Sequence, residues 1–170
     1  MTETTLTPAR VWKQMTPDER YHVARAFWDD PEATDDQIQA AVLIAQQKKF
    51  RAKTVINLDL DRKARHLATM AMLPEALVAR ALVAYHLAAQ RPMMGAFLDA
   101  LGIAHDSGLI SEDAVTPDPA KLAPAVTAIS GRFPAADVRI YLTTLLCQDP
   151  ETWGGLSALV GESSATSSPP

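Results

Sequence analysis

The residues best suited to chemistry lie around an interruption in a long apolar stretch, between positions 86 and 106. A helix that opens at Pro92 exposes unbonded N–H groups and the positive end of its dipole, which favours an anion. Arg91 would add a bidentate donor there. The loop after Gly102 could fold back and bring an acid and a base to the same helix end. The candidate ligand-binding residues are His86, Arg91, Asp99, His105 and Asp106.

Each of these residues also has a structural interpretation, which we favour. A histidine on an apolar helix, such as His86, is typical of a core or boundary position with one satisfied hydrogen bond. Arg91 could bond the last carbonyls of its own helix or pair with Asp99, and such pairs also arise without function. Asp99 and His105 lie on different predicted elements, so their convergence depends on the tertiary fold.

A second candidate region is strongly basic. Residues 48–66 carry a net charge of +5 in a chain whose total is −4, and such asymmetry can mark a phosphate-binding face. Because Phe50 is the one aromatic residue among the charges and the whole chain is acidic, we favour a solvated face over nucleic-acid binding. The candidate phosphate-contacting residues are Lys48, Lys49, Arg51, Lys53, Arg62 and Arg65.

Metal and covalent chemistry have little support. Glu19 and His22 match half of a di-iron motif, but Glu19 is better explained as the capping-box partner of Thr16. The single cysteine, Cys147, lies in an apolar run and is expected to be a buried small hydrophobe. The sequence has no glycine-rich phosphate loop, dinucleotide fingerprint, nucleophile elbow or zinc-type spacing. We therefore expect no metal, no cofactor, and a non-catalytic protein rather than an enzyme.

The elements that would position these residues are helices. Good helix formers dominate, glycine is scarce, and no run alternates in the manner of a strand. We predict an all-α fold, an irregular helical bundle of about eight helices around a central apolar helix at about residues 74–90. Prolines and capping residues place the helices at about residues 17–28, 34–50, 60–71, 74–90, 92–101, 119–130, 134–147 and 150–160.

Some local details are specific enough to test. The stretch from Thr16 to Glu19 has the pattern of a capping box, and the stretch from Thr34 to Gln37 repeats the capping pattern. Residues 102–118 form the longest irregular stretch. One face of the helix after Thr34 is shared by Ile38, Val42 and Ala45, with Ala41 and Ile44 beside them.

Length and composition predict one soluble domain. A chain of 170 residues with 48% hydrophobic residues can bury a core. We expect a single helical domain over residues 1–160 and a disordered Ser/Pro-rich tail over residues 161–170. The first 15 residues lack the apolar stretch of a secretory signal, and no long apolar run is present. We therefore expect a cytoplasmic location and no membrane association.

Three functions remain, in order of preference. The first is a non-catalytic protein-interaction or self-association module, whose partner is another protein or a second copy. Exposed Trp and Met side chains would supply its contact surface, although the cluster of Met70, Met72, Met93 and Met94 is better explained as core filling. The second is a small anionic-ligand or enzymatic site around residues 86–106. The third is nucleic-acid binding through residues 48–66.

Overall fold

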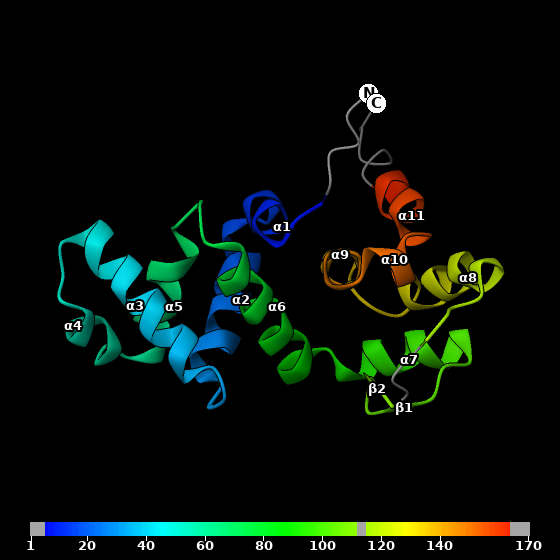
Figure 1. Cartoon of the computed structure of the whole chain (residues 1–170), viewed down its shortest axis with the longest axis horizontal. Helices are drawn as coiled ribbons and strands as arrows, with labels where there is room; N and C mark the ends of the chain where they lie inside the picture. The colour runs from blue at the N-terminus through cyan, green and yellow to red at the C-terminus, as the bar shows by residue number, and fades with distance from the viewer. Residues whose placement is uncertain (1–5, 112–114, 164–170) are drawn as a thin grey trace. The chain divides into compact units, whose positions relative to one another are not determined.

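The structure, a computed structural model, describes the backbone of residues 6–111 and 115–163, with side chains as far as residue 160. Within this part of the chain, eleven helices and one two-stranded hairpin form the predicted all-α fold (Figure 1). The helices beyond the predicted eight are short. They are α1 (Pro8–Gln14), α4 (Ala52–Ile56), and one from the division of the last predicted helix into α10 (Pro150–Trp153) and α11 (Leu156–Ser163).

The chain divides into two compact units, residues 1–89 and residues 90–170, and each is described by itself. The single domain expected over residues 1–160 stays a prediction. The helix α11 ends at Ser163, and residues 164–170 of the expected tail lie outside the described residues. Among the described helices, none combines the length and hydrophobicity needed to span a bilayer.

In the first unit, α2 lies between two helices that it packs against, α5 and α6 (Figure 1). The core contains Trp12, whose indole N–H donates to the Met70 carbonyl at 2.7 Å. The predicted apolar helix, α6, packs against α1, α2 and α3 within this unit. The bounds of the main helices are α2 (Pro17–Asp29), α3 (Thr34–Lys48), α5 (Leu60–Ala68) and α6 (Glu75–Ala89).

The predicted helix starts near residues 17 and 34 are both confirmed, but only the first of the two predicted capping patterns is present. The Thr16 hydroxyl accepts from the Glu19 N–H at 3.2 Å and the Glu19 carboxylate accepts from the Thr16 N–H at 3.0 Å, which is a complete capping box. Thr34, by contrast, is the first helical residue, and the cap of α3 is Ala33, which has no side-chain acceptor. Gln37 instead turns back, and its amide donates to the Phe27 and Asp30 carbonyls, both at 2.8 Å. Gln37 therefore joins the start of α3 to the end of α2.

The face that α3 buries also differs from the apolar face read from the sequence. The buried residues are Ala40, Ala41, Ile44 and Ala45, while Ile38 and Val42 are 48% and 40% exposed. The sequence of α3 is apolar on several sides, so its periodicity does not single out one face. Packing against neighbouring helices decides the face instead.

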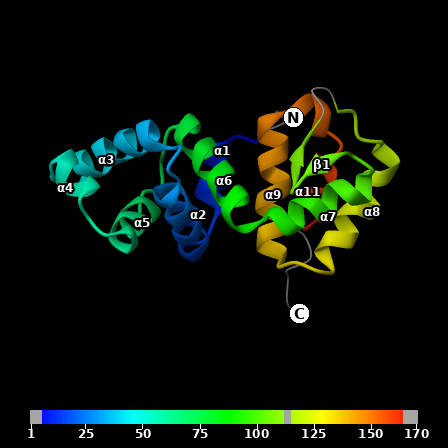
Figure 2. The ribbon, with the colours of Figure 1, turned by 90° about the horizontal axis from the view of Figure 1, so that it is seen from below.

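In the second unit, α7 packs against α8, and α9 contacts α8, α10 and α11 (Figure 2). The ring of Phe97 on α7 makes an edge contact with Tyr141 on α9, with centroids 5.6 Å apart. The bounds are α7 (Arg91–Leu101), β1 (His105–Asp106), β2 (Leu109–Ile110), α8 (Pro119–Ser130) and α9 (Ala135–Gln148).

The hairpin of β1 and β2 corrects the expectation that residues 102–118 are irregular throughout. His105 pairs with Ile110 and Asp106 with Leu109. The two loop residues, Ser107 and Gly108, have φ values of 50° and 88°, the positive pair of a type I′ turn. Strands of two residues are too short to show an alternating pattern, so the sequence does not reveal them.

Candidate functional site

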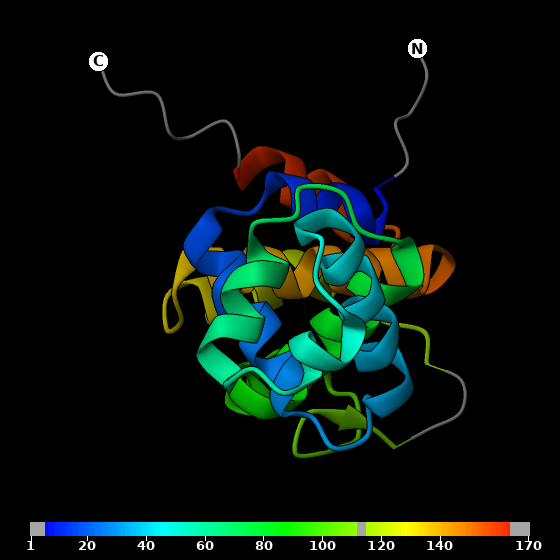
Figure 3. The same ribbon diagram turned by 90° about the vertical axis from the view of Figure 1, so that its left-hand side faces the viewer.

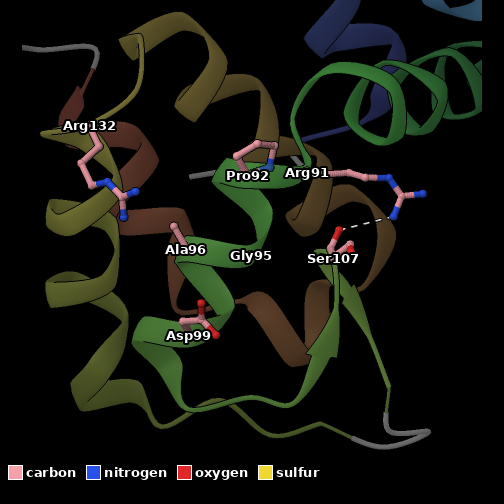
Figure 4. Close-up of a pocket in the computed structure, with 7 residues that line it drawn as sticks. All are labelled: Arg91, Pro92, Gly95, Ala96, Asp99, Ser107 and Arg132. Atoms are coloured by element: carbon pink, nitrogen blue, oxygen red, sulfur yellow. Dashed lines mark hydrogen bonds between the residues drawn. The ribbon is translucent and has the colours of Figure 1, made fainter.

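The predicted ligand region of the second unit contains an open pocket of about 500 Å³ beside α7 (Figure 4). Two of the five predicted residues, Arg91 and Asp99, line it. Ser107 and Arg132 also line it and were missed, because they come from the hairpin and from the α8–α9 connection, and no local pattern links them to α7. The remaining lining residues are Pro92, Gly95 and Ala96.

His105 is held by both of its ring nitrogens. Its Nδ1 accepts from the Gly108 N–H at 3.1 Å, so the neutral ring carries its proton on Nε2. The Nε2–H then donates to Asp99 Oδ1 at 2.8 Å. The histidine side chain is 14% exposed and the aspartate side chain 75% exposed. The structure thus brings Asp99 and His105 together.

This contact has a clear structural consequence, because it joins the hairpin to α7. Gly95 lies so close to the ring that a Cβ there would be 3.2 Å from His105 Cε1. A Cβ on Gly108 would be 2.6 Å from Met94 Cβ. With both ring nitrogens engaged inside the unit, His105 would have to give up one of these bonds to act as a general base.

The two arginines of the pocket do not converge on one point. Figure 4 shows the Arg91 side chain extending away from Arg132, toward the Ser107 carbonyl, to which its Nη1 donates at 3.4 Å. The Arg132 guanidinium carbon lies 5.4 Å from the centroid of the Phe133 ring. Asp106 is exposed and accepts from the Ser107 hydroxyl at 3.3 Å. The geometry therefore lacks the paired donors that would clamp an anion.

The fifth candidate, His86, belongs to the first unit. It is buried on α6, and burial lowers the pKa of its imidazole from 6.5 to about 4. At neutral pH it is an uncharged core residue.

The basic segment separates into two parts with different surroundings. On α5, Arg62 pairs with Asp59 at 3.5 Å and Arg65 with Asp61 at 2.8 Å. Hydrogen bonds from Arg65 and then from the Tyr21 hydroxyl lower the pKa of the Asp61 carboxyl. The ammonium of Lys63 lies 5.1 Å from the centroid of the Trp28 ring. The basic residues of α5 are therefore engaged with their own unit.

The other part of the segment, at the end of α3 and the start of α4, remains exposed. In the described part of the chain, none of its four basic residues forms an ion pair. Phe50 stands among them, 44% exposed, with its ring edge-on to His66 at 5.9 Å. The four exposed basic residues are Lys48, Lys49, Arg51 and Lys53.

Exposed apolar side chains gather around the same helices. Of the seven large hydrophobic residues exposed in the described part, four lie between positions 38 and 56. Figure 3 shows α3 and α4 on the side of their unit that faces the viewer. We call this surface the α3–α4 face. It comprises the apolar residues Ile38, Val42, Phe50 and Ile56.

The methionines and tryptophans expected as contact residues lie elsewhere. Met70, Met93 and Met94 are buried, as the core interpretation predicted, and Met72 is 84% exposed. All three tryptophans are buried. Cys147, expected to be buried, is half-buried near the end of α9. These residues do not form the proposed contact surface.

Within the described residues, no three histidine, cysteine or acidic side chains gather closely enough to hold a metal ion. Comparison with protein-family models, with curated proteins and with solved structures finds no match to this chain.

Proposed function

We propose that this chain is a non-catalytic protein-interaction module, cytoplasmic as its sequence suggests, that binds through the α3–α4 face. The observation that carries the proposal is the exposure of Ile38, Val42 and Ile56 on two adjacent helices and of Phe50 in the connection between them. Apolar side chains grouped on one surface are typical of a protein contact, whereas scattered ones need no explanation.

The charged surroundings of the face support the same function. Lys48, Lys49, Arg51 and Lys53 flank the apolar residues, which matches an apolar centre with a charged rim. Since these cations have no ion-pair partner in the described residues, an acidic partner can approach without first breaking an internal pair. The α7 pocket supports a ligand less well, because its arginines point apart and its histidine is engaged on both nitrogens.

The test is capture of a bound protein by the immobilised full chain from a nuclease-treated lysate of its own organism. The double variant Ile38→Ser/Val42→Ser removes apolar surface from exposed positions and should leave the fold intact. The matched control is Met72→Ser, which changes the most exposed hydrophobic side chain at a site outside α3 and α4. We expect the wild type and the control to retain a protein, which can be the chain itself, and the double variant to lose it.

Two results would overturn the proposal. One is equal capture by the wild type and the double variant, since the face would then make no contribution. The other is capture that occurs in an untreated lysate but not in the nuclease-treated one, together with a low-salt gel shift of nucleic acid. That gel shift would have to be lost when the four exposed basic residues are changed to Ala. That combination would assign the face to nucleic acid.

A further inference from the structure

One helix of the α3–α4 face carries a gradient of exposed charge along its length. At the start of α3, Glu32 and Asp35 are exposed and form no ion pair in the described part of the chain. Their neighbours Asp30 and Asp36 differ, because both contact Arg80, at 2.7 and 3.9 Å. At the other end, Lys48 and Lys49 are exposed and equally unpaired within the described residues. The helix is therefore acidic at its beginning and basic at its end, which also suits its own dipole.

Between these ends, α3 exposes Ile38 and Val42 together with three glutamines, Gln39, Gln46 and Gln47. Ile38 and Val42 are four residues apart, so they lie one above the other on the helix surface. The middle of α3, at residues 40–41, is nearly equidistant from Ile38 and Val42 and from the two charged ends. The order of acidic, apolar and basic residues along α3 is therefore complementary to itself when two copies lie antiparallel.

We propose that the partner of the α3–α4 face is a second copy of the chain, bound with the two α3 helices antiparallel. This inference rests on the proposed function and specifies its partner. An axis near residues 40–41 sets Ile38 of one copy against Val42 of the other. It also brings the acidic end of each α3, with Glu32 and Asp35, level with the basic end of the other, with Lys48 and Lys49. One surface thus satisfies both halves of an isologous contact.

The charges give this partner its specificity. A parallel arrangement would place acid against acid and base against base, whereas the antiparallel one brings opposite charges together at both ends. A helix pair is smaller than a standard interface of about 800 Å² per partner. We therefore expect a weak dimer that dissociates further as salt is raised.

The experiment uses charge reversal and mixing of full-length chains. The basic variant is Glu32→Lys/Asp35→Lys and the acidic variant is Lys48→Glu/Lys49→Glu. In a dimer of either variant alone, like charges face each other at both ends. In a mixed dimer all four contacts are attractive. The control Asp18→Lys/Glu151→Lys makes the same change in net charge as the basic variant, at exposed first-turn positions of other helices.

Sedimentation velocity at low salt then gives the mass of each sample. We expect each reversed variant to dissociate at least about tenfold more readily than the wild type. For an equimolar mixture of the two variants, the dissociation constant of the dimer should lie within about threefold of the wild-type value. The dissociation constant of the control should equal that of the wild type. A mixture no heavier than its separate components would overturn the antiparallel pairing.

A wild-type chain that is monomeric up to about 1 mM would overturn self-association altogether. If Ile38→Ser/Val42→Ser nevertheless abolished capture of a different protein, the interaction face would stand and only the second copy would be rejected. If the wild type and Ile38→Ser/Val42→Ser captured the same proteins equally well, the proposed function itself would be rejected.

Discussion

Gly108 determines how closely the hairpin approaches α7. Its φ of 88° is a conformation that L side chains rarely adopt, and a Cβ there would lie 2.6 Å from Met94 Cβ and 3.2 Å from the Arg91 carbonyl oxygen. We expect Gly108→Ala to lower the free energy of unfolding by about 2–4 kcal/mol through strain and overpacking. Urea denaturation of the full chain measures this change.

The matched control is Gly131→Ala at the end of α8. Gly131 has a φ of −79°, and the nearest atom to a Cβ there is 3.8 Å away. We expect this variant to stay within about 1 kcal/mol of the wild type. Equal losses in the two variants would show that the hairpin contact contributes nothing specific.

His86 makes stability depend on pH. Its folded-state pKa of about 4 lies below the ordinary 6.5, so the folded chain binds this proton more weakly than the unfolded chain. The stability that depends on neutral His86 is complete above about pH 6.5 and is lost as the pH falls toward 4. Between pH 7 and pH 4.5 the loss should be about 2–3 kcal/mol.

The measurement compares pH profiles of the unfolding free energy. In His86→Gln this part of the profile should flatten, whereas His22→Gln, at an exposed histidine on α2, should keep the wild-type slope. Identical slopes in wild type and His86→Gln would contradict burial of a neutral imidazole.

At the scale of elements, Gln37 links two helices that the sequence shows only as neighbours. Its amide donates to the Phe27 and Asp30 carbonyls at the end of α2, both at 2.8 Å. Each carbonyl also accepts a longer backbone bond, from the Asp30 N–H at 3.4 Å and the Ala33 N–H at 3.2 Å. We expect Gln37→Ala to lower the free energy of unfolding by about 1–2 kcal/mol, because the two carbonyls lose their shorter hydrogen bonds. Gln39→Ala, at an exposed position of the same helix, should cost less than about 0.5 kcal/mol in the same thermal melts.

Local chemistry explains which elements could be predicted. The capping box at Thr16 and Glu19 depends on residues three apart, and the structure contains it. The pairs of Arg62 with Asp59 and of Arg65 with Asp61 are equally local, at spacings of three and four on one helix. Because such spacings are visible in the sequence alone, they could have separated these two arginines from the exposed basic residues.

Other features depend on contacts distant in sequence. The approach of Arg132 to the α7 pocket and the choice of buried face on α3 follow from packing between helices, which a single sequence does not encode locally. The contact of Asp99 with His105 spans only six residues, but it requires a hairpin whose strands are two residues long. From the sequence, it could be predicted only that Asp99 and His105 belong to the same candidate region.

At the scale of the whole molecule, the acidic total of −4 conceals an uneven surface. On α5, Arg62 and Arg65 form ion pairs and Lys63 lies over the Trp28 ring, whereas the basic residues beside α3 and α4 form no ion pair in the described part of the chain. Exposed cations beside exposed apolar side chains make the α3–α4 face the surface best suited to a partner.

Binding of a protein by this face, and specifically of a second copy, is tested most directly by light scattering. The quantity measured is the molar mass of the full chain as its concentration increases at low salt. We expect a rise from 18.4 kDa toward twice that value for the wild type and for Met72→Ser. The double variant Ile38→Ser/Val42→Ser should stay at 18.4 kDa. A wild-type mass that stays at 18.4 kDa, or a double variant that dimerises as readily as the wild type, would contradict the proposed dimer.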